Sequence, residues 1–367
     1  MFVLVAMSVK NASSPVLRNV TEAIPWFPTP LSNLIYAFVA LPHTSKMYQI
    51  GGCEKDKASK AIMCCDLTKA PIGEAKWERS GEMPTACSFT SMAIVDNIIY
   101  GIDNGQVLDT VRSYDFKTGT LTTILPLRHL RYGHVIVACN KILYVFGGDT
   151  QAGMSVSCEP YDAQGEMFDT QAVEKKWCVM PPMNRWRMSC GALAYEDKIY
   201  AMGGLDDNNT FVDECECFDP ITQKWTTLKP MNISRPISIC VLVPHFDHTD
   251  VGKSMRVGTC MIAVLGGCAN YGADITNQVE LYDIVNDRWC IAPWTLPTPR
   301  IDFSAFVVGG DTDACGVVVC GGYEDDRYHD RYHDRCDMLT VATGEWTPLQ
   351  PLPSPWHSAA FTTSIIQ

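Results

Sequence analysis

Short apolar segments recur along the chain, and polar turns separate them. Five of these segments end in a Gly-Gly pair, at Gly52, Gly148, Gly204, Gly267 and Gly322. A degenerate copy, IIYGID, stands around Gly101, where one member of the series is missing. No helical periodicity with capping signals is evident, and apolar runs bounded by glycine and polar turns predict short β-strands.

A large side chain follows most of these segments at a recurring distance. The slot is filled by Trp77, Trp177, Trp225, Trp289 and Trp346, and by Leu121 in the degenerate unit. An aromatic residue or leucine stands seven residues earlier in four units, at Tyr114, Phe218, Tyr282 and Leu339. Turn formers such as DPITQK and DIVND lie between the two positions. Each unit therefore predicts four strands: a, b ending in Gly-Gly, c ending at the aromatic residue, and d beginning at the tryptophan.

Units of about 45–50 residues with four strands each predict the blades of a β-propeller. Glycine at the end of strand b suits a crowded position that excludes a Cβ, and the aromatic side chains can pack between neighbouring blades. In such a meander the d–a and b–c connections lie on one face of the disc. The a–b and c–d connections lie on the other.

The Gly-Gly, Tyr and Trp pattern resembles the Kelch repeat, and the resemblance covers essentially the whole chain. It implies an all-β fold of four-stranded antiparallel blades that form a single propeller domain over residues 1–367. Kelch domains of the BTB–Kelch family close the ring with a C-terminal strand that completes the first blade, and usually have six blades.

We predict seven blades here, with six as the alternative. The tryptophan slots define six units, at about residues 29–84, 85–127, 128–183, 184–231, 232–297 and 298–353. The seventh blade would combine residues 1–28, which offer two strand-like segments and Trp26, with residues 354–367, which resemble a strand a. This closure would leave no free sheet edge around the ring. If residues 2–26 are only a linker, six blades remain.

Composition narrows the class of protein. The chain has 29 Lys and Arg against 41 Asp and Glu, a net charge of −12, and no basic stripe, which argues against nucleic-acid binding. A hydrophobic fraction of 47% indicates a large buried core. No apolar run reaches the ~18–20 residues that a bilayer requires. Several of the 17 cysteines lie in apolar strands, so we expect reduced thiols and a cytoplasmic or nuclear protein that does not bind membranes.

An arginine recurs just before strand a and is expected at one mouth of the central channel. These residues are Arg131, Arg187, Arg235 and Arg300. The same face should carry Tyr132, Trp186, Phe303, Trp356 and His357 from d–a connections, and Asp206, Asn208, Tyr271 and Tyr323 from b–c loops. Arginine forks suit carboxylates and phosphates, so the face is expected to bind an acidic or phosphorylated peptide. The alternative is that each arginine pairs locally with the backbone or with acids between blades.

BTB–Kelch receptors bind degrons on this face with the pre-strand arginines and with residues after Gly-Gly. The resemblance therefore implies a noncatalytic substrate-recognition domain of an adaptor for a Cullin-3 ubiquitin ligase. No BTB or BACK helices are present in this chain, so contact with Cullin-3 would need a BTB domain outside it. An actin- or cytoskeleton-binding scaffold is the alternative.

The near-duplication DRYHDRYHDRC carries His329, His333 and Cys336, whose spacing would suit zinc if the loop were helical. A solvated loop is favoured, and we expect neither metal nor cofactor. His245 and His248 lie in an a–b connection on the opposite face, so they cannot complete that site. Propeller enzymes that resemble galactose oxidase or sialic-acid mutarotases are a third alternative. However, no phosphate-binding Gly loop, nucleophile elbow or H-E-x-x-H motif is present, and no catalytic residue is expected.

Overall fold

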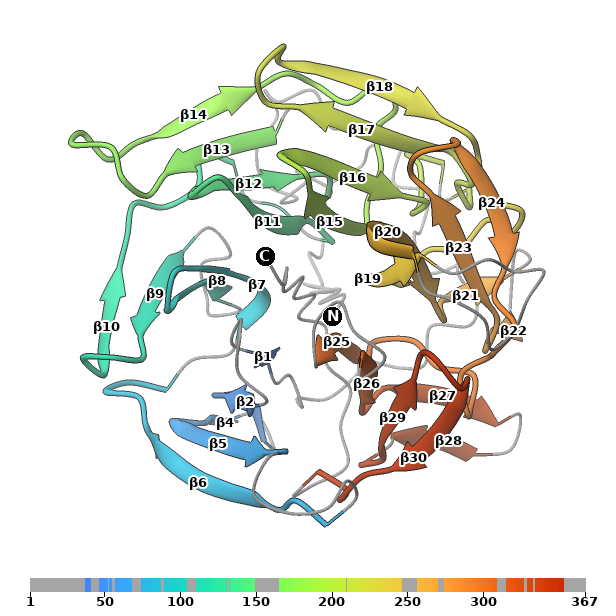
Figure 1. Ribbon diagram of the computed structural model, residues 1–367. Coiled ribbons are helices and arrows are strands. Elements are labelled where there is room, and N and C mark those ends of the chain that lie inside the picture. The colour runs from blue at the N-terminus through green and yellow to red at the C-terminus, as the bar shows by residue number, and fades with distance from the viewer. Residues whose placement is uncertain are drawn as a thin grey trace, which may run out of the picture.

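The computed structural model describes residues 37–352, apart from 41–45, 52, 55–56, 68–73, 87–88, 104–109, 130, 132, 149–164, 209, 246–255, 270–273, 309–314, 327–328 and 333. Six four-stranded antiparallel sheets are arranged as a ring around a central axis (Figure 1). The all-β propeller of four-stranded blades predicted from the sequence is confirmed. The blade count is six, the alternative, and not the favoured seven.

Each blade is a continuous stretch of chain. Blade 1 contains β1 (Ala37–Ala40), β2 (Lys46–Ile50), β5 (Ala61–Asp66) and β6 (Trp77–Glu82). Blade 2 contains β7 (Phe89–Val95), β8 (Ile98–Asp103), β9 (Val111–Asp115) and β10 (Thr120–Thr123). Blade 3 contains β11 (Val135–Cys139), β12 (Ile142–Phe146), β13 (Gly165–Asp169) and β14 (Trp177–Met180).

Blade 4 contains β15 (Gly191–Tyr195), β16 (Lys198–Met202), β17 (Cys215–Asp219) and β18 (Lys224–Leu228). Blade 5 contains β19 (Ile239–His245), β20 (Arg256–Leu265), β23 (Val279–Asp283) and β24 (Arg288–Ile291). Blade 6 contains β25 (Ser304–Val308), β26 (Gly316–Cys320), β29 (Cys336–Thr340) and β30 (Glu345–Pro348). Three b–c connections form small hairpins of their own: β3 (Cys53–Glu54) with β4 (Lys57–Ala58), β21 (Cys268–Ala269) with β22 (Asp274–Ile275), and β27 (Tyr323–Asp326) with β28 (His329–Tyr332).

The ring closes where blade 6 meets blade 1, and this contact corrects the prediction of seven blades. The innermost strands β25 and β1 lie side by side (Figure 1). Behind them Met47 and Cys65 of blade 1 share one apolar core with Val318, Cys320 and other side chains of blade 6. No space for a seventh sheet remains between these two blades. The segments predicted to build it, residues 1–28 and 354–367, lie outside the described residues. The expected closure by a C-terminal strand stays a prediction, because residues 354–367 are not described; the four described strands of blade 1 are consecutive.

Burial falls from the inner strands to the outer strand of each blade. The c strand β17 is buried at four of its five positions, whereas β6 on the outside is mostly exposed. Inner strands are covered by neighbouring blades on both faces, so they read as nearly continuous apolar runs. This burial pattern explains why the sequence shows apolar segments instead of strict alternation.

The tryptophan at or next to the start of strand d joins its blade to the preceding one. The indole Nε1–H of Trp177 donates to the Leu125 carbonyl at 2.8 Å, and that of Trp225 donates to the Pro181 carbonyl at 3.0 Å. Equivalent bonds run from Trp289 to Lys229 and from Trp346 to Thr295 at 2.8 Å. Each ring thus buries apolar area between blades and also satisfies its polar atom.

The Gly-Gly pair at the end of strand b is required by both conformation and space. Gly203 and Gly204 have φ values of +63° and +108°. A Cβ on Gly204 would stand 2.7 Å from the carbonyl oxygen of Met188, which is backbone and cannot move aside easily. Only glycine fits where strand b ends against the preceding d–a connection.

Two findings concern the chemical class of the protein. In the part of the chain that the structure describes, no helix is long and apolar enough to cross a membrane. The cysteines described there are free thiols, ten of them buried, from Cys65 in blade 1 to Cys336 in blade 6.

Candidate interaction face

The four predicted arginines lie at equivalent positions in blades 3 to 6, and all are buried. Arg131 is 1% exposed, and Arg187, Arg235 and Arg300 are 0% exposed. Each follows the outer strand of the preceding blade and stands four residues before strand a of its own blade. Their guanidinium groups therefore lie beneath the face and not on it.

Each arginine pairs with an acid on strand c of its own blade. Arg187 Nη2 lies 2.5 Å from Glu216 Oε1, and its Nη1 donates to the Gly203 carbonyl at 3.0 Å. Arg235 Nη2 lies 2.9 Å from Glu280 Oε2.

The other two blades repeat this arrangement with longer contacts. Arg131 Nε lies 3.6 Å from Glu166 Oε1, and Arg300 Nη2 lies 3.4 Å from Asp337 Oδ2. Burial lowers the pKa of Arg300, and the Asp337 charge opposes that shift. A first-glycine carbonyl, such as that of Gly321 for Arg300, completes each guanidinium site.

The paired glutamates also hold the preceding d–a connection. Glu216 accepts hydrogen bonds from the backbone N–H groups of Asn184 at 2.8 Å and Arg185 at 3.2 Å. Glu280 binds the N–H groups of Asn232 and Ile233 in the same way, and Glu166 those of Arg128 and His129. Each buried unit thus ties together a strand c, a Gly-Gly turn and a d–a connection.

These contacts correct the role assigned to the arginines. The groups expected to face a carboxylate or phosphate ligand are neutralised inside the blades, as the structural alternative proposed. Phe303 and Tyr323 are also buried, at 1% and 8% exposure. None of the four guanidinium groups is therefore exposed to bind an acidic or phosphorylated ligand.

One exposed cluster does form on this face, where the connection from blade 3 to blade 4 meets the b–c loop of blade 4. Arg185, with 37% of its side chain exposed, donates from Nη2 to Asp206 Oδ2 at 2.8 Å and from Nη1 to Glu214. Asp206 also accepts the backbone N–H groups of Asn208 at 2.9 Å and Thr210 at 2.8 Å, so it orders the loop. The structure therefore brings Asp206 and Asn208 together with Arg185.

Trp186 lies half-buried beside Arg185, and its Nε1–H donates to the Gly148 carbonyl at 3.1 Å. Sequence reasoning chose Arg187 from the segment NRWRMS and missed Arg185, which is the arginine that reaches the surface. The remaining predicted residues, Tyr132, Tyr271, Trp356 and His357, lie outside the described residues.

A buried histidine links blades 2 and 3 beneath the same face. His134 Nδ1 lies 3.1 Å from the Arg131 carbonyl and therefore carries the proton, so Nε2 accepts from the Ser91 hydroxyl at 2.9 Å. Burial, together with the Arg131 charge, lowers the pKa of His134 to about 4. The ring is neutral at physiological pH, which marks it as part of the core.

The histidine-rich loop does not form a metal site in the described part of the chain. His329 lies on strand β28, Cys336 is buried on strand β29, and His333 is outside the described residues. No group of three His, Cys, Asp or Glu side chains among the described residues is arranged to hold a metal ion. His245 is buried on the opposite face, 3.5 Å from Asp283, and His248 is not described.

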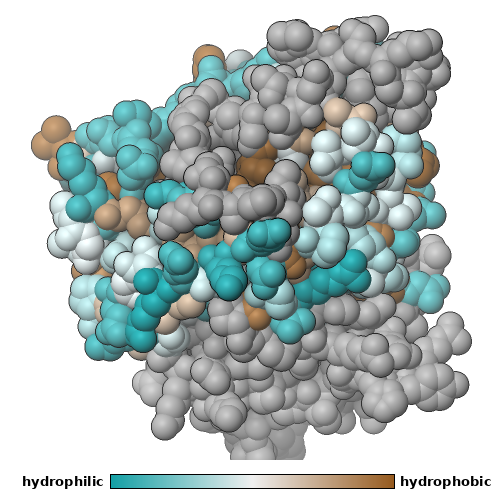
Figure 2. All heavy atoms as spheres, turned by 60° about the horizontal axis from the view of Figure 1, so that its bottom comes forward, coloured by the Kyte–Doolittle hydropathy of each residue, from teal (hydrophilic) through white to brown (hydrophobic). Residues whose placement is uncertain are grey.

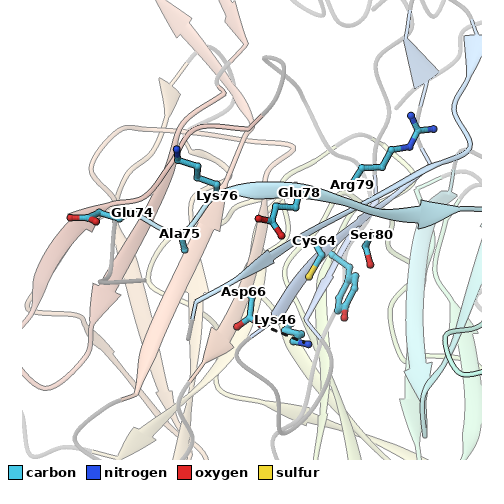
Figure 3. A pocket seen from close by; sticks show the side chains of 10 residues that line it. Lys46, Cys64, Asp66, Glu74, Ala75, Lys76, Glu78, Arg79 and Ser80 are labelled. Atoms are coloured by element: carbon cyan, nitrogen blue, oxygen red, sulfur yellow. Dashed lines mark ion pairs between the residues drawn. The ribbon is translucent and has the colours of Figure 1, made fainter. Parts of the chain in front are cut away.

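A pocket of about 330 Å³ lies on blade 1, at the end where the a–b and c–d connections run (Figure 3). Of the charged groups that line it, Lys46 and Asp66 form an ion pair, with Nζ 3.7 Å from Oδ2. Burial and the neighbouring Cys64 raise the pKa of Tyr48 to about 12, so the phenol stays protonated near neutral pH.

Exposed apolar side chains do not suggest another surface. The large ones among the described residues are Leu125, Val173, Val179, Ile221, Val285 and Ile291, on separate turns and outer strands. Among the coloured residues of Figure 2, hydrophilic side chains predominate and hydrophobic ones form small separate spots. Single exposed apolar residues are normal for soluble proteins.

The comparisons with known proteins agree with the class that the fold defines. The Kelch motif model matches residues 130–184 and 187–232, which include two of the buried Arg–Glu units. The chain is a Kelch-repeat β-propeller, and it resembles Kelch-like proteins.

Individual relatives are distant. The chain is 26% identical to human Kelch-like protein 23 over 203 residues, 53% of this chain and 33% of the relative. It is 24% identical to zebrafish Kelch repeat and BTB domain-containing protein 8 over 49% of this chain and 35% of the relative. Alpha-scruin of Limulus polyphemus is 24% identical over 67% of this chain and 26% of its own length. The chain thus spans about a quarter to a half of the curated relatives that it matches.

A solved structure, that of YjhT, superposes with a TM-score of 0.61 at 14% identity. It covers 88% of this chain and 99% of that one. At this identity the match supports the propeller fold alone. A protein-interaction module is the functional class that the Kelch-like relatives support.

Proposed function

We propose that this propeller is a noncatalytic recognition domain whose d–a/b–c face binds a peptide segment of a partner protein. We further propose that it serves as the substrate-receiving part of a BTB–Kelch adaptor for a Cullin-3 ubiquitin ligase, in the cytoplasm or nucleus. The printed name of one relative pairs Kelch repeats with a BTB domain, which supports the second proposal.

One observation carries the first proposal. The buried Arg187–Glu216 unit fixes the turn that presents Arg185 and Trp186, and Arg185 binds Asp206 in the neighbouring b–c loop. Two loops from different parts of the sequence therefore meet in a defined arrangement at the surface. Binding residues are commonly found on loops that a rigid scaffold positions.

The two faces also differ in their connections. In blades 2 to 4 the a–b turns are two residues long, as at Glu196 and Asp197, whereas the b–c connections occupy residues 104–110, 147–164 and 203–214. Long connections supply contact surface that a two-residue turn lacks. The d–a/b–c face is therefore the better surface for a partner.

Site-specific cross-linking tests the proposed face. A photoreactive amino acid would replace Asn208 on this face or, as a matched control, Asp197 on the a–b turn of the same blade. In cells we expect a discrete cross-linked partner from position 208 and none from position 197. Cross-linking from position 197 alone would place recognition on the opposite face. Loss of the position-208 partner's ubiquitination when Cullin-3 is depleted would test the ligase role separately.

A further inference from the structure

Two buried cysteines face each other across neighbouring strands of blade 6. Cys320 ends strand β26, Cys336 begins strand β29, and the antiparallel register places the two residues directly opposite each other. Both side chains are 0% exposed. Among the paired strands that the structure describes, no other cysteine stands opposite a second cysteine.

The backbone hydrogen bonds show which kind of pair this is. The Gly321 N–H donates to the Arg335 carbonyl at 3.0 Å, one position beyond the two cysteines. The Cys336 carbonyl accepts the Leu349 N–H at 2.9 Å, on the other side of its strand. Hydrogen-bonded and non-hydrogen-bonded pairs alternate along an antiparallel ladder, so Cys320 and Cys336 form a non-hydrogen-bonded pair. In such a pair the Cα atoms are about 4.5 Å apart and the side chains approach closely.

This arrangement suits a disulfide between the two strands. Disulfides join cysteines whose Cα atoms are about 4.4–6.8 Å apart and whose Cβ atoms point toward each other. Burial, together with a hydrogen bond between the two thiols, raises the pKa of Cys336 well above its ordinary value. The two sulfurs are therefore already in contact, and a bond between them requires no movement of the strands.

A third thiol lies nearby but lacks this geometry. Cys65 of blade 1 belongs to the same apolar core and is 2% exposed. In its own sheet it stands opposite Met47 and Trp77. A bond from Cys65 to either cysteine of blade 6 would have to join two separate sheets, and no strand register prepares it.

We propose that Cys320 and Cys336 form a dithiol site that hydrogen peroxide oxidises to a disulfide within blade 6. One thiolate attacks the peroxide: an S–O bond forms, the O–O bond breaks, and the leaving oxygen takes up the thiol's proton as water. The facing thiol then attacks the sulfenic sulfur. An S–S bond forms, the S–O bond breaks, and the second oxygen leaves as water with the second proton. The two thiols lose two electrons, which one peroxide accepts.

The position of the site determines when it reacts and what the bond holds. Because both sulfurs are buried, peroxide reaches them during local openings of the blade, and reclosure shields the finished disulfide from reductants. The bond closes residues 321–335 into a loop, which is the whole b–c connection of blade 6 with its hairpin β27–β28. Oxidation therefore clamps the base of one connection on the d–a/b–c face. The site itself does not depend on the proposed function.

Mass spectrometry of the full chain tests the proposal. The reduced protein is treated with hydrogen peroxide, its remaining thiols are alkylated after denaturation, and it is digested without reduction. The test variant is Cys336→Ala. The matched control is Cys315→Ala, because Cys315 is a buried cysteine just before the same strand β26 and packs in a different core.

We expect one linked peptide pair, which joins Cys320 to Cys336 and is two hydrogens lighter than the reduced peptides. It should form equally in the unchanged protein and in Cys315→Ala. The oxidised protein should also unfold at a higher denaturant concentration than the reduced protein, because the bond restricts the unfolded chain. Cys315→Ala should keep this shift of the midpoint, and Cys336→Ala should lose it.

Three results would overturn the proposal. A link from Cys65 to either cysteine would show that the bond joins blades 1 and 6 and not two strands of one sheet. Absence of any link at Cys320 in oxidised protein that circular dichroism shows to be folded would exclude the site. A lower midpoint after oxidation would show that the sheet must distort to form the bond. None of these results bears on the proposed interaction face, which the cross-links from positions 208 and 197 test separately.

Discussion

Blades 3 to 6 differ from blades 1 and 2 in the residue that occupies one position of strand c. This position pairs with the strand-b residue that stands two positions before Gly-Gly, and in blades 3 to 6 it holds an acid, as Glu216 does opposite Ala201. The same position holds Met63 in blade 1 and Arg112 in blade 2. The buried arginine–acid pair therefore occurs in only part of the ring, and a blade can form without it.

The junction between blades 1 and 2 differs in a second way. Leu121 occupies the slot where tryptophans join the other blades, and Phe116 from the c–d turn packs on Tyr48 with ring centroids 4.8 Å apart. The aromatic contact has moved from strand to turn, and no indole remains to donate to the preceding blade. Burial of apolar side chains between neighbouring blades is therefore required, whereas the residue that supplies it can change.

Breaking a buried pair should have the largest effect. Arg187→Ala leaves Glu216 buried without its partner and should cost about 3–5 kcal/mol of unfolding free energy. Arg112→Ala, at the strand-c position of blade 2 and partly exposed, should cost about 1 kcal/mol or less. Chemical denaturation of both variants measures the difference. A stable Arg187→Ala protein that loses only ligand binding would return this arginine to the recognition surface.

Lowering the pH should destabilise the junction between blades 2 and 3, because His134 is buried there as a neutral ring. Its folded pKa of about 4 lies below the ordinary value of 6.5, so the unfolded chain binds the proton first. The stability that His134 contributes is complete above pH 6.5 and is lost as pH falls towards 4, by about 3 kcal/mol. His134→Gln should remove this dependence between pH 6.5 and 4. Denaturation curves that keep the same slope against pH in the variant would contradict the assignment.

The tryptophan slot should be the next most sensitive position. Trp225→Leu places in blade 4 the same residue as Leu121 of blade 2, without an equivalent of Phe116. It also removes the hydrogen bond to the Pro181 carbonyl. We expect a loss of about 2 kcal/mol from reduced burial and one missing hydrogen bond. Thermal unfolding measures it, with Val179→Ala on an exposed outer strand as the control. A loss below that of the control would show that blades 3 and 4 do not depend on this indole.

The smallest effect concerns compensation at the blade 1–2 junction. Phe116→Ala should destabilise the protein, and adding Leu121→Trp should recover about 1 kcal/mol of the unfolding free energy by restoring the usual slot. A double-mutant cycle in denaturant gives the coupling. Additive losses would mean that Phe116 does not replace the missing tryptophan.

Strands, turns and tryptophan slots could be predicted because their signals are local. The Asp219 carboxylate, for example, accepts the N–H groups of Ile221 and Thr222 within the c–d turn. The number of blades depends on how successive sheets are angled around the ring, and no short segment encodes it. The terminal segments looked strand-like, yet blade 6 already meets blade 1.

The site was harder to predict because a buried and an exposed arginine look alike in sequence. Arg187 and Glu216 pair across two strands and a loop, and Arg235 and Glu280 are further apart still. A usable signal was present in strand c, where an acid stands between two apolar residues at the second position of CECFD and VELYD. A single charge within a buried strand requires a partner, and the pre-strand arginine was the available one.

The contact between blades 6 and 1 also has a chemical consequence. Cys65, Cys320 and Cys336 lie buried in this one core, and burial raises the pKa of Cys65 to about 12. A thiol reacts as its thiolate, so Cys65 is unreactive, and burial keeps reagents away from all three sulfurs while the two blades stay in contact. Their rate of alkylation therefore measures how often the ring opens between blades 6 and 1.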